Sequence, residues 1–246
     1  MKKLMLIIGL VLFLSLTGLA HANLLGDGLV SYWKGNTTDM MGSNTATLDG
    51  NATADSGTGK YSSTGIDCDG DGDYFNTFNI TAVVGNQQDF SVSGWSKADT
   101  KNGDFDGLFA NGDADNDNGF RTMYASESGL GWGMRSFGGG VAQTFTAGTM
   151  NTGTYYNSLV TYNASSGSLK YYIDGSLVIT HTKTPSGFIN FVDNLKFCSF
   201  NGGGVTSRDF DGRFSDMAVW NKTLDAGNLT ALQTNGFDTF TFPPGP

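Results

Sequence analysis

The strongest constraint on this chain is its hydrophobic pattern, which changes every few residues and almost never follows helical spacing. Short alternating or aromatic-rich runs are separated by Gly, Asn, Asp, Ser and Thr. A period of two places successive side chains on opposite faces of a strand, and the intervening small polar residues are typical of turns. The pattern therefore predicts an all-β fold. We expect strands at residues 29–33, 90–95, 159–162, 169–173, 176–180, 195–200 and 217–220.

Two local signals refine this prediction. Asp174 and Gly175 stand alone between two expected strands, and a two-residue Asp-Gly loop favours a type I′ hairpin turn. Residues 224–232 carry the one helical pattern, which predicts a short helix near the C-terminus. A sheet protein of this length must protect its edges. A two-sheet jelly roll and a closed barrel both do so, and strand spacing does not separate them.

Several segments resemble, in order, the laminin G-like jelly-roll domains of the concanavalin A-like lectin/glucanase superfamily. They are residues 28–33 (GLVSYW), 69–74 (DGDGDY), 90–95 (FSVSGW), 159–162 (LVTY), 169–175 (LKYYIDG) and 210–224 (FDGRFSDMAVWNKTL). The resemblance covers about residues 26–236 and implies a two-sheet antiparallel jelly-roll sandwich. It departs from the family at residues 155–157, where YYN replaces Trp-His-His, and at Met217, where the family has an acid. Lectins, hydrolases, adhesins and structural modules share this fold, so the resemblance implies no single function.

The N-terminus is typical of a secretory signal peptide. Lys2 and Lys3 precede an apolar run, and residues 20–22 (AHA) supply a cleavage point. We expect a signal peptide at residues 1–22, a jelly-roll domain at 23–236 and a tail at 237–246. The chain is then secreted, to the extracellular space or the cell surface, with no membrane span in its mature part. The alternative is that residues 1–22 stay attached as an uncleaved N-terminal membrane anchor.

The chain is acidic, with a formal net charge of −9. Such a charge disfavours binding to nucleic acid or anionic lipid.

Cys68 and Cys198 are the only cysteines. An oxidising compartment favours a disulfide between them, and two buried free thiols are the alternative.

The chain lacks the residues that most catalytic mechanisms require. Glu127 is the only glutamate, so no Glu pair exists for glycoside hydrolysis, although an Asp pair stays open. His181 is the only histidine after the leader, and we expect it on the surface of a strand. A Ser-His-Asp arrangement would have to use it. The sequence therefore predicts a non-catalytic protein.

Calcium is the metal that the acidic loops favour, because it prefers several oxygen ligands. Residues 67–73 and 113–119 both begin like an EF-hand loop, but Phe78 and Tyr124 occupy the closing position instead of Glu. We interpret the first stretch as a structural turn. The resemblance implies a different, structural calcium site at Asp39 and Asp216. The alternative is that Asp39 caps a turn and Asp216 accepts backbone hydrogen bonds.

A saccharide site usually combines an aromatic ring with polar side chains. Trp132 is the candidate ring, because the glycines beside it should leave its faces uncovered. The side chains expected to supply polar contacts around it are Arg121, Tyr124 and Arg135, with Asp113, Asp115 and Asp117 on the acidic loop. A core position for Trp132 and a solvated acidic loop are the alternatives.

These observations predict a secreted module that binds glycans or glycoproteins. A structural surface protein, such as an adhesin or filament subunit, is the second hypothesis. It rests on the tail, where Phe240 and Phe242 could mediate self-association. A hydrolase or lyase that acts through aspartates is the third.

Overall fold

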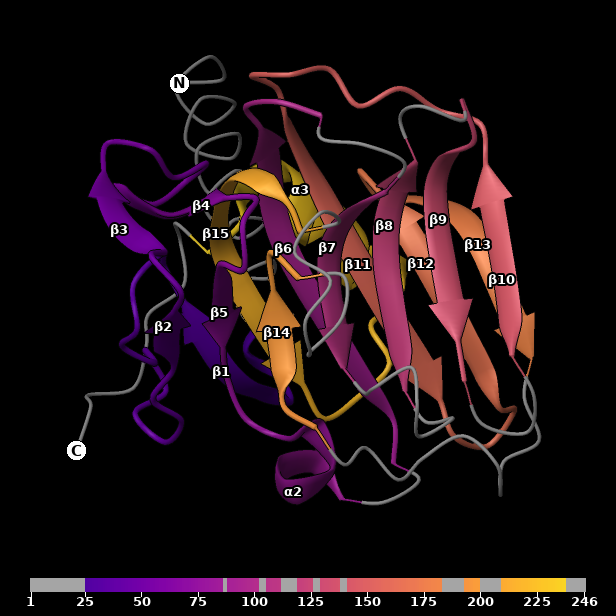
Figure 1. Ribbon diagram of the computed structural model, residues 1–246. Coiled ribbons are helices and arrows are strands. Elements are labelled where there is room, and N and C mark those ends of the chain that lie inside the picture. The colour runs from indigo at the N-terminus through magenta and orange to yellow at the C-terminus, as the bar shows by residue number, and fades with distance from the viewer. Residues whose placement is uncertain are drawn as a thin grey trace, which may run out of the picture.

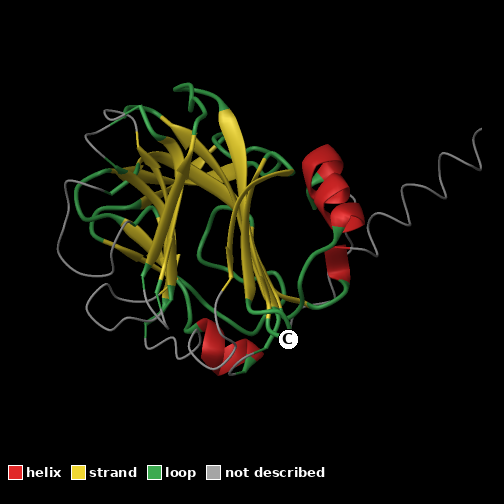
Figure 2. Cartoon of the chain, turned by 90° about the vertical axis from the view of Figure 1, so that its right-hand side faces the viewer, coloured by secondary structure: helices red, strands yellow, loops and turns green. Residues whose placement is uncertain are grey.

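The computed structural model describes residues 25–85, 88–101, 105–111, 119–125, 129–137, 141–182, 193–199 and 209–237 of the chain. These residues form two antiparallel sheets that pack face to face (Figure 1). The jelly-roll sandwich predicted from the sequence is confirmed. Figure 2 shows the two layers edge-on, with a helix lying outside one of them.

The first sheet has eight strands. In spatial order they are β13 (Ser176–Thr182), β12 (Ser168–Ile173), β11 (Tyr155–Asn163), β6 (Phe90–Ala98), β15 (Asp211–Trp220), β4 (Thr64–Asp69) and β3 (Thr53–Ser56), with β1 (Leu29–Trp33) also paired to β15. The long strand β15 pairs with β4 through its first half and with β1 through its second half.

The second sheet has seven strands. In spatial order they are β10 (Ala142–Thr146), β9 (Gly131–Ser136), β8 (Phe120–Ala125), β7 (Asp106–Asn111), β14 (Leu195–Phe197), β5 (Tyr74–Asn76) and β2 (Thr47–Asp49). Chain neighbours β7 to β10 are adjacent in space, whereas β14 enters between β7 and β5 from a distant part of the chain.

The core lies between the two sheets and is dominated by aromatic rings. Phe197 of β14 contacts Phe75 and Phe109 within its own sheet, at centroid distances of 6.2 and 5.4 Å. Across the sandwich its centroid lies 5.7 Å from that of Phe214 on β15. Gly94 makes room for this contact, because a Cβ there would lie 3.1 Å from the Phe197 ring. Burying such rings is the main favourable term in folding a sandwich of this kind.

The predicted hairpin and C-terminal helix are both present. Asp174 and Gly175 connect β12 to β13 with φ values of 46° and 75°, as a type I′ turn requires. Helix α3 (Ala226–Asn235) begins with a capping box between Asp225 and Asn228. A second short helix, α2 (Ile80–Val84), was not predicted, because its single turn is too short to show a helical period.

Helix α3 packs on the outer face of the eight-stranded sheet. Leu229 and Leu232 join Leu159 of β11 and Trp220 of β15 in a separate hydrophobic cluster. Phe237 closes this cluster, since its ring stacks on Tyr32 at 4.0 Å and on Trp220 at 5.9 Å. The first residue of the expected tail is therefore part of the domain, while residues 238–246 lie outside the described part of the chain.

Candidate functional site

A groove separates α3 from the neighbouring strands β11 and β12. Its volume is about 870 Å³, which is within the range of small-molecule binding sites. Polar side chains and apolar ones such as Leu224 and Leu229 both line it. The sheet contributes Thr161, Ser168, Lys170 and Tyr172 to this lining, and the helix contributes Thr230 and Gln233. We call this feature the α3 groove.

Strand alternation places the sheet side of the α3 groove. Leu169, Tyr171 and Ile173 of β12 are buried in the core. The intervening side chains therefore point out of the sandwich toward α3. The ring of Tyr172 is partly exposed there, and burial raises the pKa of its phenol, so the hydroxyl stays a donor at neutral pH.

Hydrogen bonds hold the helix side of the α3 groove against the sheet. Gln233 Nε2 donates to Asn157 Oδ1 at 2.9 Å, and the Tyr61 hydroxyl donates to the Gln233 carbonyl at 2.9 Å. These bonds bridge α3 to β11 and to the loop before β4. The amide of Gln233 is therefore held in place at the wall of the groove.

Two carboxylates border the α3 groove, and both have structural partners. Asp174 Oδ1 accepts from the Asn157 backbone N–H at 2.8 Å, and burial raises the pKa of this carboxyl group. Asp225 Oδ1 accepts from the Asn228 backbone N–H at 3.0 Å and caps α3. Glycoside hydrolysis requires an acid and a second carboxylate that acts as base or nucleophile. One oxygen of each carboxylate is therefore engaged in local structure, a turn at Asp174 and a helix cap at Asp225.

The expected aromatic platform, Trp132, is in the core. Only 4% of Trp132 is exposed, and its ring packs against Tyr124 at 5.1 Å and Tyr156 at 5.3 Å. Tyr124 is also buried. The prediction of an uncovered ring was wrong because alternation on β9 turns Trp132 inward, where Gly148 packs against its indole.

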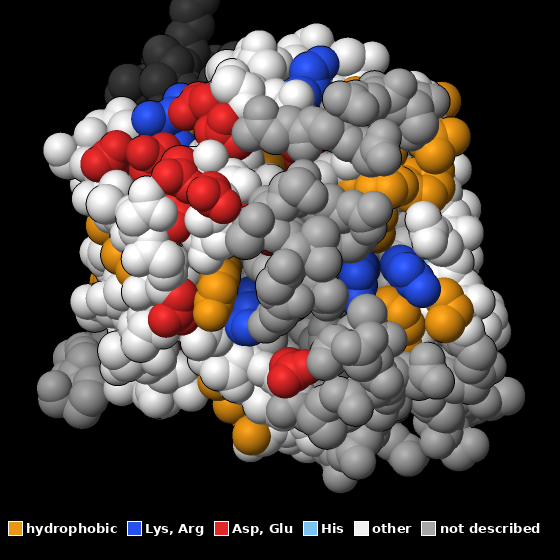
Figure 3. All heavy atoms as spheres, viewed as in Figure 1, with side chains coloured by type: hydrophobic (Ala, Val, Ile, Leu, Met, Phe, Trp, Pro, Cys, Tyr) orange, Lys and Arg blue, Asp and Glu red, His pale blue; other side chains and the backbone are white. Residues whose placement is uncertain are grey.

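Arg121 and Arg135 lie on the opposite side of the same strands. They are direct cross-strand partners on β8 and β9, and each guanidinium carbon lies 4.9 Å from the centroid of the Phe137 ring. Figure 3 views this outer face of the seven-stranded sheet, where Lys and Arg side chains lie beside hydrophobic ones. The structure therefore separates the four predicted residues into a buried aromatic pair and an outward arginine pair. Asp113, Asp115, Asp117 and Glu127 lie outside the described residues.

Asp39 and Asp216 both accept hydrogen bonds from Tyr32, one from its backbone and one from its side chain. The Tyr32 backbone N–H donates to Asp39 Oδ1 at 3.0 Å, and the Tyr32 hydroxyl donates to Asp216 Oδ1 at 2.6 Å. Asp216 Oδ2 also accepts from the Tyr61 N–H at 3.2 Å. Burial raises the pKa of Asp216 despite these hydrogen bonds.

The Asp39 carboxylate does not fit a calcium ligand. Besides Tyr32, the backbone N–H of Met41 donates to Oδ1 at 3.0 Å, and those of Ser43 and Asn44 donate to Oδ2 at 3.3 and 3.0 Å. Four donors fill the lone-pair sites of one carboxylate. Within the described ranges, no three His, Cys, Asp or Glu side chains group as a metal site would require.

His181 is buried, which corrects the expectation of a surface histidine. Its Nδ1 lies 2.8 Å from Ser136 Oγ, and its Nε2 lies 3.0 Å from Thr144 Oγ1. Ser136 is fully buried, so its hydroxyl is not placed to attack a substrate. The His181–Ser136 contact links the two sheets and has a structural role.

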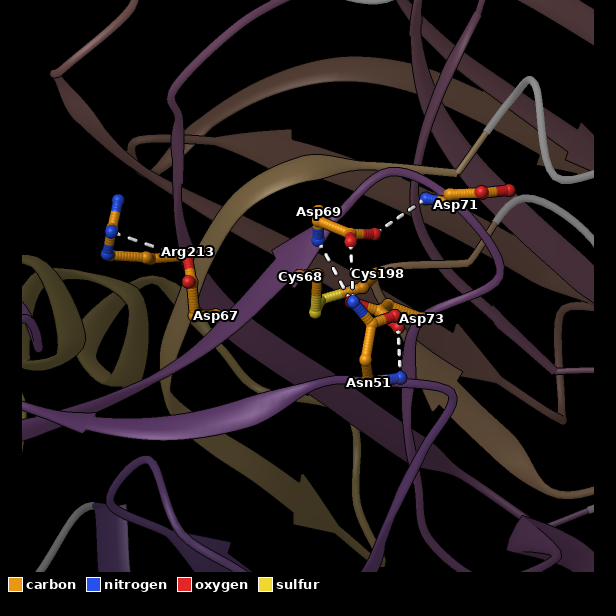
Figure 4. Close-up of a disulfide and its surroundings, with 8 residues drawn as sticks. All are labelled: Asn51, Asp67, Cys68, Asp69, Asp71, Asp73, Cys198 and Arg213. Atoms are coloured by element: carbon orange, nitrogen blue, oxygen red, sulfur yellow. Dashed lines mark hydrogen bonds and ion pairs between the residues drawn. A yellow bond between two sulfur atoms is a disulfide. The ribbon is translucent and has the colours of Figure 1, made fainter.

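The two cysteines form a disulfide between the sheets (Figure 4). Cys68 belongs to β4, and Cys198 directly follows β14, with Cα atoms 6.4 Å apart. The sequence left two alternatives open, a disulfide and two buried free thiols, and the structure contains the disulfide.

The Asp-rich stretch next to Cys68 is a hydrogen-bonded turn, as interpreted from the sequence. Asp73 accepts from the backbone N–H of Asn51 at 2.7 Å and from that of Asp69 at 3.0 Å. Asp69 accepts from the Asn51 side chain at 2.7 Å and from the Asp71 N–H at 3.0 Å (Figure 4). The Asn51 hydrogen bond is the main cause that lowers the pKa of Asp69, whereas burial raises the pKa of Asp73.

Sequence reasoning did not identify the α3 groove. The alternation of Ser168, Lys170 and Tyr172 was visible in the sequence and could have indicated one polar face. The position of α3 was not visible, because it depends on contacts with strands far away in the sequence.

Comparisons with known proteins agree with this fold. A family model described as the concanavalin A-like lectin/glucanases superfamily matches residues 69–230, which is more than half of the chain. No curated protein matches the sequence. Within the described residues, no helix is both long and apolar enough to cross a membrane.

Three solved structures illustrate the likeness. Domain 4 of a GH43 extracellular arabinanase from Geobacillus stearothermophilus, in complex with arabinotriose, is 17% identical with a TM-score of 0.65, covering 84% of this chain and 98% of that chain. The binding domain of Paraclostridial Mosquitocidal Protein 1 is 16% identical with a TM-score of 0.64. The match covers 85% of this chain and 52% of that chain. A Trypanosoma rangeli sialidase, in complex with 2,3-difluorosialic acid, is 14% identical with a TM-score of 0.68. The match covers 89% of this chain and 34% of that chain.

At these identities the likeness shows the fold alone, and the chain spans about half of the second structure and a third of the third. Binding domains and enzymes thus share this architecture. The family match and the observed sandwich lead to the same conclusion: the chain belongs to the concanavalin A-like lectin/glucanases superfamily.

Proposed function

We propose that this protein is an exported, non-catalytic carbohydrate-binding module and that its α3 groove holds the saccharide. The signal-like segment at residues 1–22 would direct it to the extracellular space or the cell surface. The single observation that carries the proposal is the α3 groove itself, a cavity of about 870 Å³ whose lining combines polar side chains with one aromatic ring, that of Tyr172.

The side chains of the α3 groove match the chemistry of a neutral sugar. Saccharide hydroxyls both donate and accept hydrogen bonds, and the groove offers hydroxyls from Ser168 and Thr230, an amine from Lys170 and an amide from Gln233. The ring of Tyr172 provides an apolar surface for the C–H face of a pyranose or furanose. Strand and helix backbones fix these groups, which reduces the entropy lost on binding.

The arabinanase domain supports this proposal, because it was solved with arabinotriose and nearly its whole chain is covered. The chain has a single glutamate, Glu127, and so lacks the Glu pair of many glycoside hydrolases, which supports binding rather than hydrolysis. An enzyme would need a carboxylate that is free to exchange a proton with the glycosidic oxygen.

The test is calorimetric titration of the purified mature chain with arabinotriose, preceded by a glycan array to rank other neutral oligosaccharides. Tyr172→Ala and Lys170→Ala should each weaken binding by about tenfold, because each removes a contact worth about 1–2 kcal/mol. Leu177→Ala is the matched control, since Leu177 is 51% exposed on the adjacent strand outside the groove.

All variants should keep the wild-type circular dichroism spectrum. An array without any bound neutral glycan, or Tyr172→Ala binding with wild-type affinity, would refute a saccharide site in the α3 groove. Release of reducing sugar by the wild type would instead indicate an enzyme.

A further inference from the structure

The turn between β12 and β13 closes one end of the α3 groove. Asp174 and Gly175 of this turn line the groove together with Gln233 near the end of α3. A Cβ at Gly175 would lie 3.2 Å from Gln233 Cγ, so the turn backbone is in contact with the helix side chain. Glycine suits this position because its φ of 75° is left-handed and because a side chain there would crowd Gln233.

Asn157 of β11 fixes both halves of this closed end. Its backbone N–H donates to Asp174 Oδ1 at 2.8 Å, and the Asp174 N–H donates to the Asn157 carbonyl at 3.0 Å. Its side-chain Oδ1 accepts from Gln233 Nε2 at 2.9 Å. Because Asn157 is buried and holds both the turn and the helix, a ligand chain cannot pass between them without breaking these hydrogen bonds.

The opposite end of the α3 groove is bordered by two exposed residues, Ser166 of the loop between β11 and β12 and Asp225 at the start of α3. The Ser166 N–H and hydroxyl both donate to Asn163 Oδ1, at 3.0 and 2.8 Å. Asp225 bonds to Asn228 of the helix that it caps. Both border residues therefore bond within their own segment rather than across the groove, which leaves this end open to solvent.

The closed end offers an acceptor beside a donor. Asp174 is exposed, and its Oδ2 accepts no hydrogen bond from any described residue, whereas its Oδ1 is engaged by Asn157. Gln233 Nε2 carries two protons and donates one of them to Asn157. The exposed Ser176 hydroxyl lines the same end. Neighbouring hydroxyl groups of one sugar residue can therefore donate to the carboxylate and accept from the amide at the same time.

We propose that the α3 groove recognises the terminal residue of a saccharide chain rather than its interior, an inference that rests on the proposed function of the groove. The terminal sugar lies against Asp174 and Gln233, and the rest of the chain leaves the groove past Ser166. An internal sugar at the closed end would need a second glycosidic bond where Gly175 meets Gln233. It also lacks the hydroxyl group that a chain end keeps free, so polar groups of the site would stay unpaired.

The experiment counts protein molecules per saccharide chain. Arabinotriose and a long linear arabinan of known chain length are titrated with the full mature chain, and sedimentation with excess protein gives the mass of the complex on the polymer. If the glycan array ranks another neutral sugar first, its trisaccharide and linear polymer take their place. We expect one protein per chain and equal affinity per chain for both ligands, because a chain of any length has one end of the recognised kind.

Variants then test the closed end. Gln233→Ala removes the contact with Gly175, so several proteins should bind along one arabinan chain. Gln143→Ala is the matched control, since Gln143 is exposed on β10 of the other sheet, and it should keep one protein per chain. Asp174→Asn keeps an acceptor for Asn157 and should weaken binding of both ligands about tenfold, because a charged acceptor is lost. Wild-type melting temperatures show that the variants fold.

Several wild-type proteins on one linear chain overturn this inference, and so does a Gln233→Ala variant that keeps one protein per chain. Either result, obtained with a trisaccharide that still binds, leaves the α3 groove standing as a saccharide site. A protein that binds no neutral glycan of any length refutes the function of the groove itself and this inference with it. The failure of chain-end recognition is therefore distinguishable from the failure of the proposed function.

Discussion

His181 Nδ1 lies 2.8 Å from Ser136 Oγ and thereby links the two sheets. His181 belongs to β13, the edge strand of the eight-stranded sheet, and Ser136 belongs to β9 of the other sheet. The second imidazole nitrogen reaches Thr144 on β10, the other edge strand. One buried side chain therefore closes one side of the sandwich with two hydrogen bonds.

The first prediction concerns this closure. His181→Ala should lower the free energy of unfolding by about 2–4 kcal/mol, because it leaves the buried Ser136 hydroxyl unpaired and opens a cavity. Urea denaturation measures the change. Thr180→Ala, an exposed neighbour on β13, should cost less than about 1 kcal/mol. Equal losses for the two variants would contradict a role of His181 in joining the sheets.

The second prediction concerns the disulfide. Cys68 and Cys198 are separated by 130 residues, so the bridge restricts a long loop in the unfolded chain. Replacing both cysteines with alanine should lower the free energy of unfolding by about 2–5 kcal/mol. A reducing agent should lower the melting temperature of the wild type and leave that of the variant unchanged. A wild type insensitive to complete reduction would show that the bridge adds no stability.

The third prediction concerns the pH dependence of stability. Burial raises the pKa of Asp216 above its ordinary value of 3.8, and the hydrogen bonds from Tyr32 and Tyr61 lower it by less. Between 3.8 and the raised pKa, the folded state binds more protons at Asp216 than the unfolded state. Stability from this group therefore falls as pH rises through that window and is constant above it.

Asp216→Asn removes this titration while keeping an acceptor for Tyr32 and a residue that tolerates the φ of 51°. The stability of the variant relative to the wild type should therefore rise between pH 3 and pH 7. Urea denaturation at a series of pH values measures both curves. If the two curves stay parallel over this range, Asp216 does not titrate as its burial implies.

The fourth prediction concerns Asp39 and calcium. Because four backbone N–H groups occupy the Asp39 carboxylate, EDTA or added calcium should leave the melting temperature unchanged. Asp39→Ala should lower the free energy of unfolding by about 2–4 kcal/mol with or without calcium, since it leaves buried donors unpaired. A fall in melting temperature with EDTA would restore the calcium site that the family resemblance implies.

The sequence predicted the parts of the fold that depend on neighbouring residues. Strand β1 begins and ends as expected, and β12 and β13 meet at Asp174 and Gly175. Helix α3 is shifted by two or three residues from its expected position, because Asp225 and Gly236 set its ends through capping. The candidate site was predicted less well. The α3 groove was not identified, and the arginines expected around Trp132, Arg121 and Arg135, lie on the opposite face of their strands. Trp132 itself has the core position that was the alternative to a surface ring.

By itself the sequence determined the alternation of each strand, the hairpin turn and the family resemblance, because these follow from local spacing and from backbone conformations that few residues accept. Only the tertiary structure decided which face of β9 is buried, where α3 lies, and that Gly175 of the hairpin turn meets Gln233 of the helix. These relationships depend on the spatial order of the strands, which is set by packing between segments far apart in the sequence.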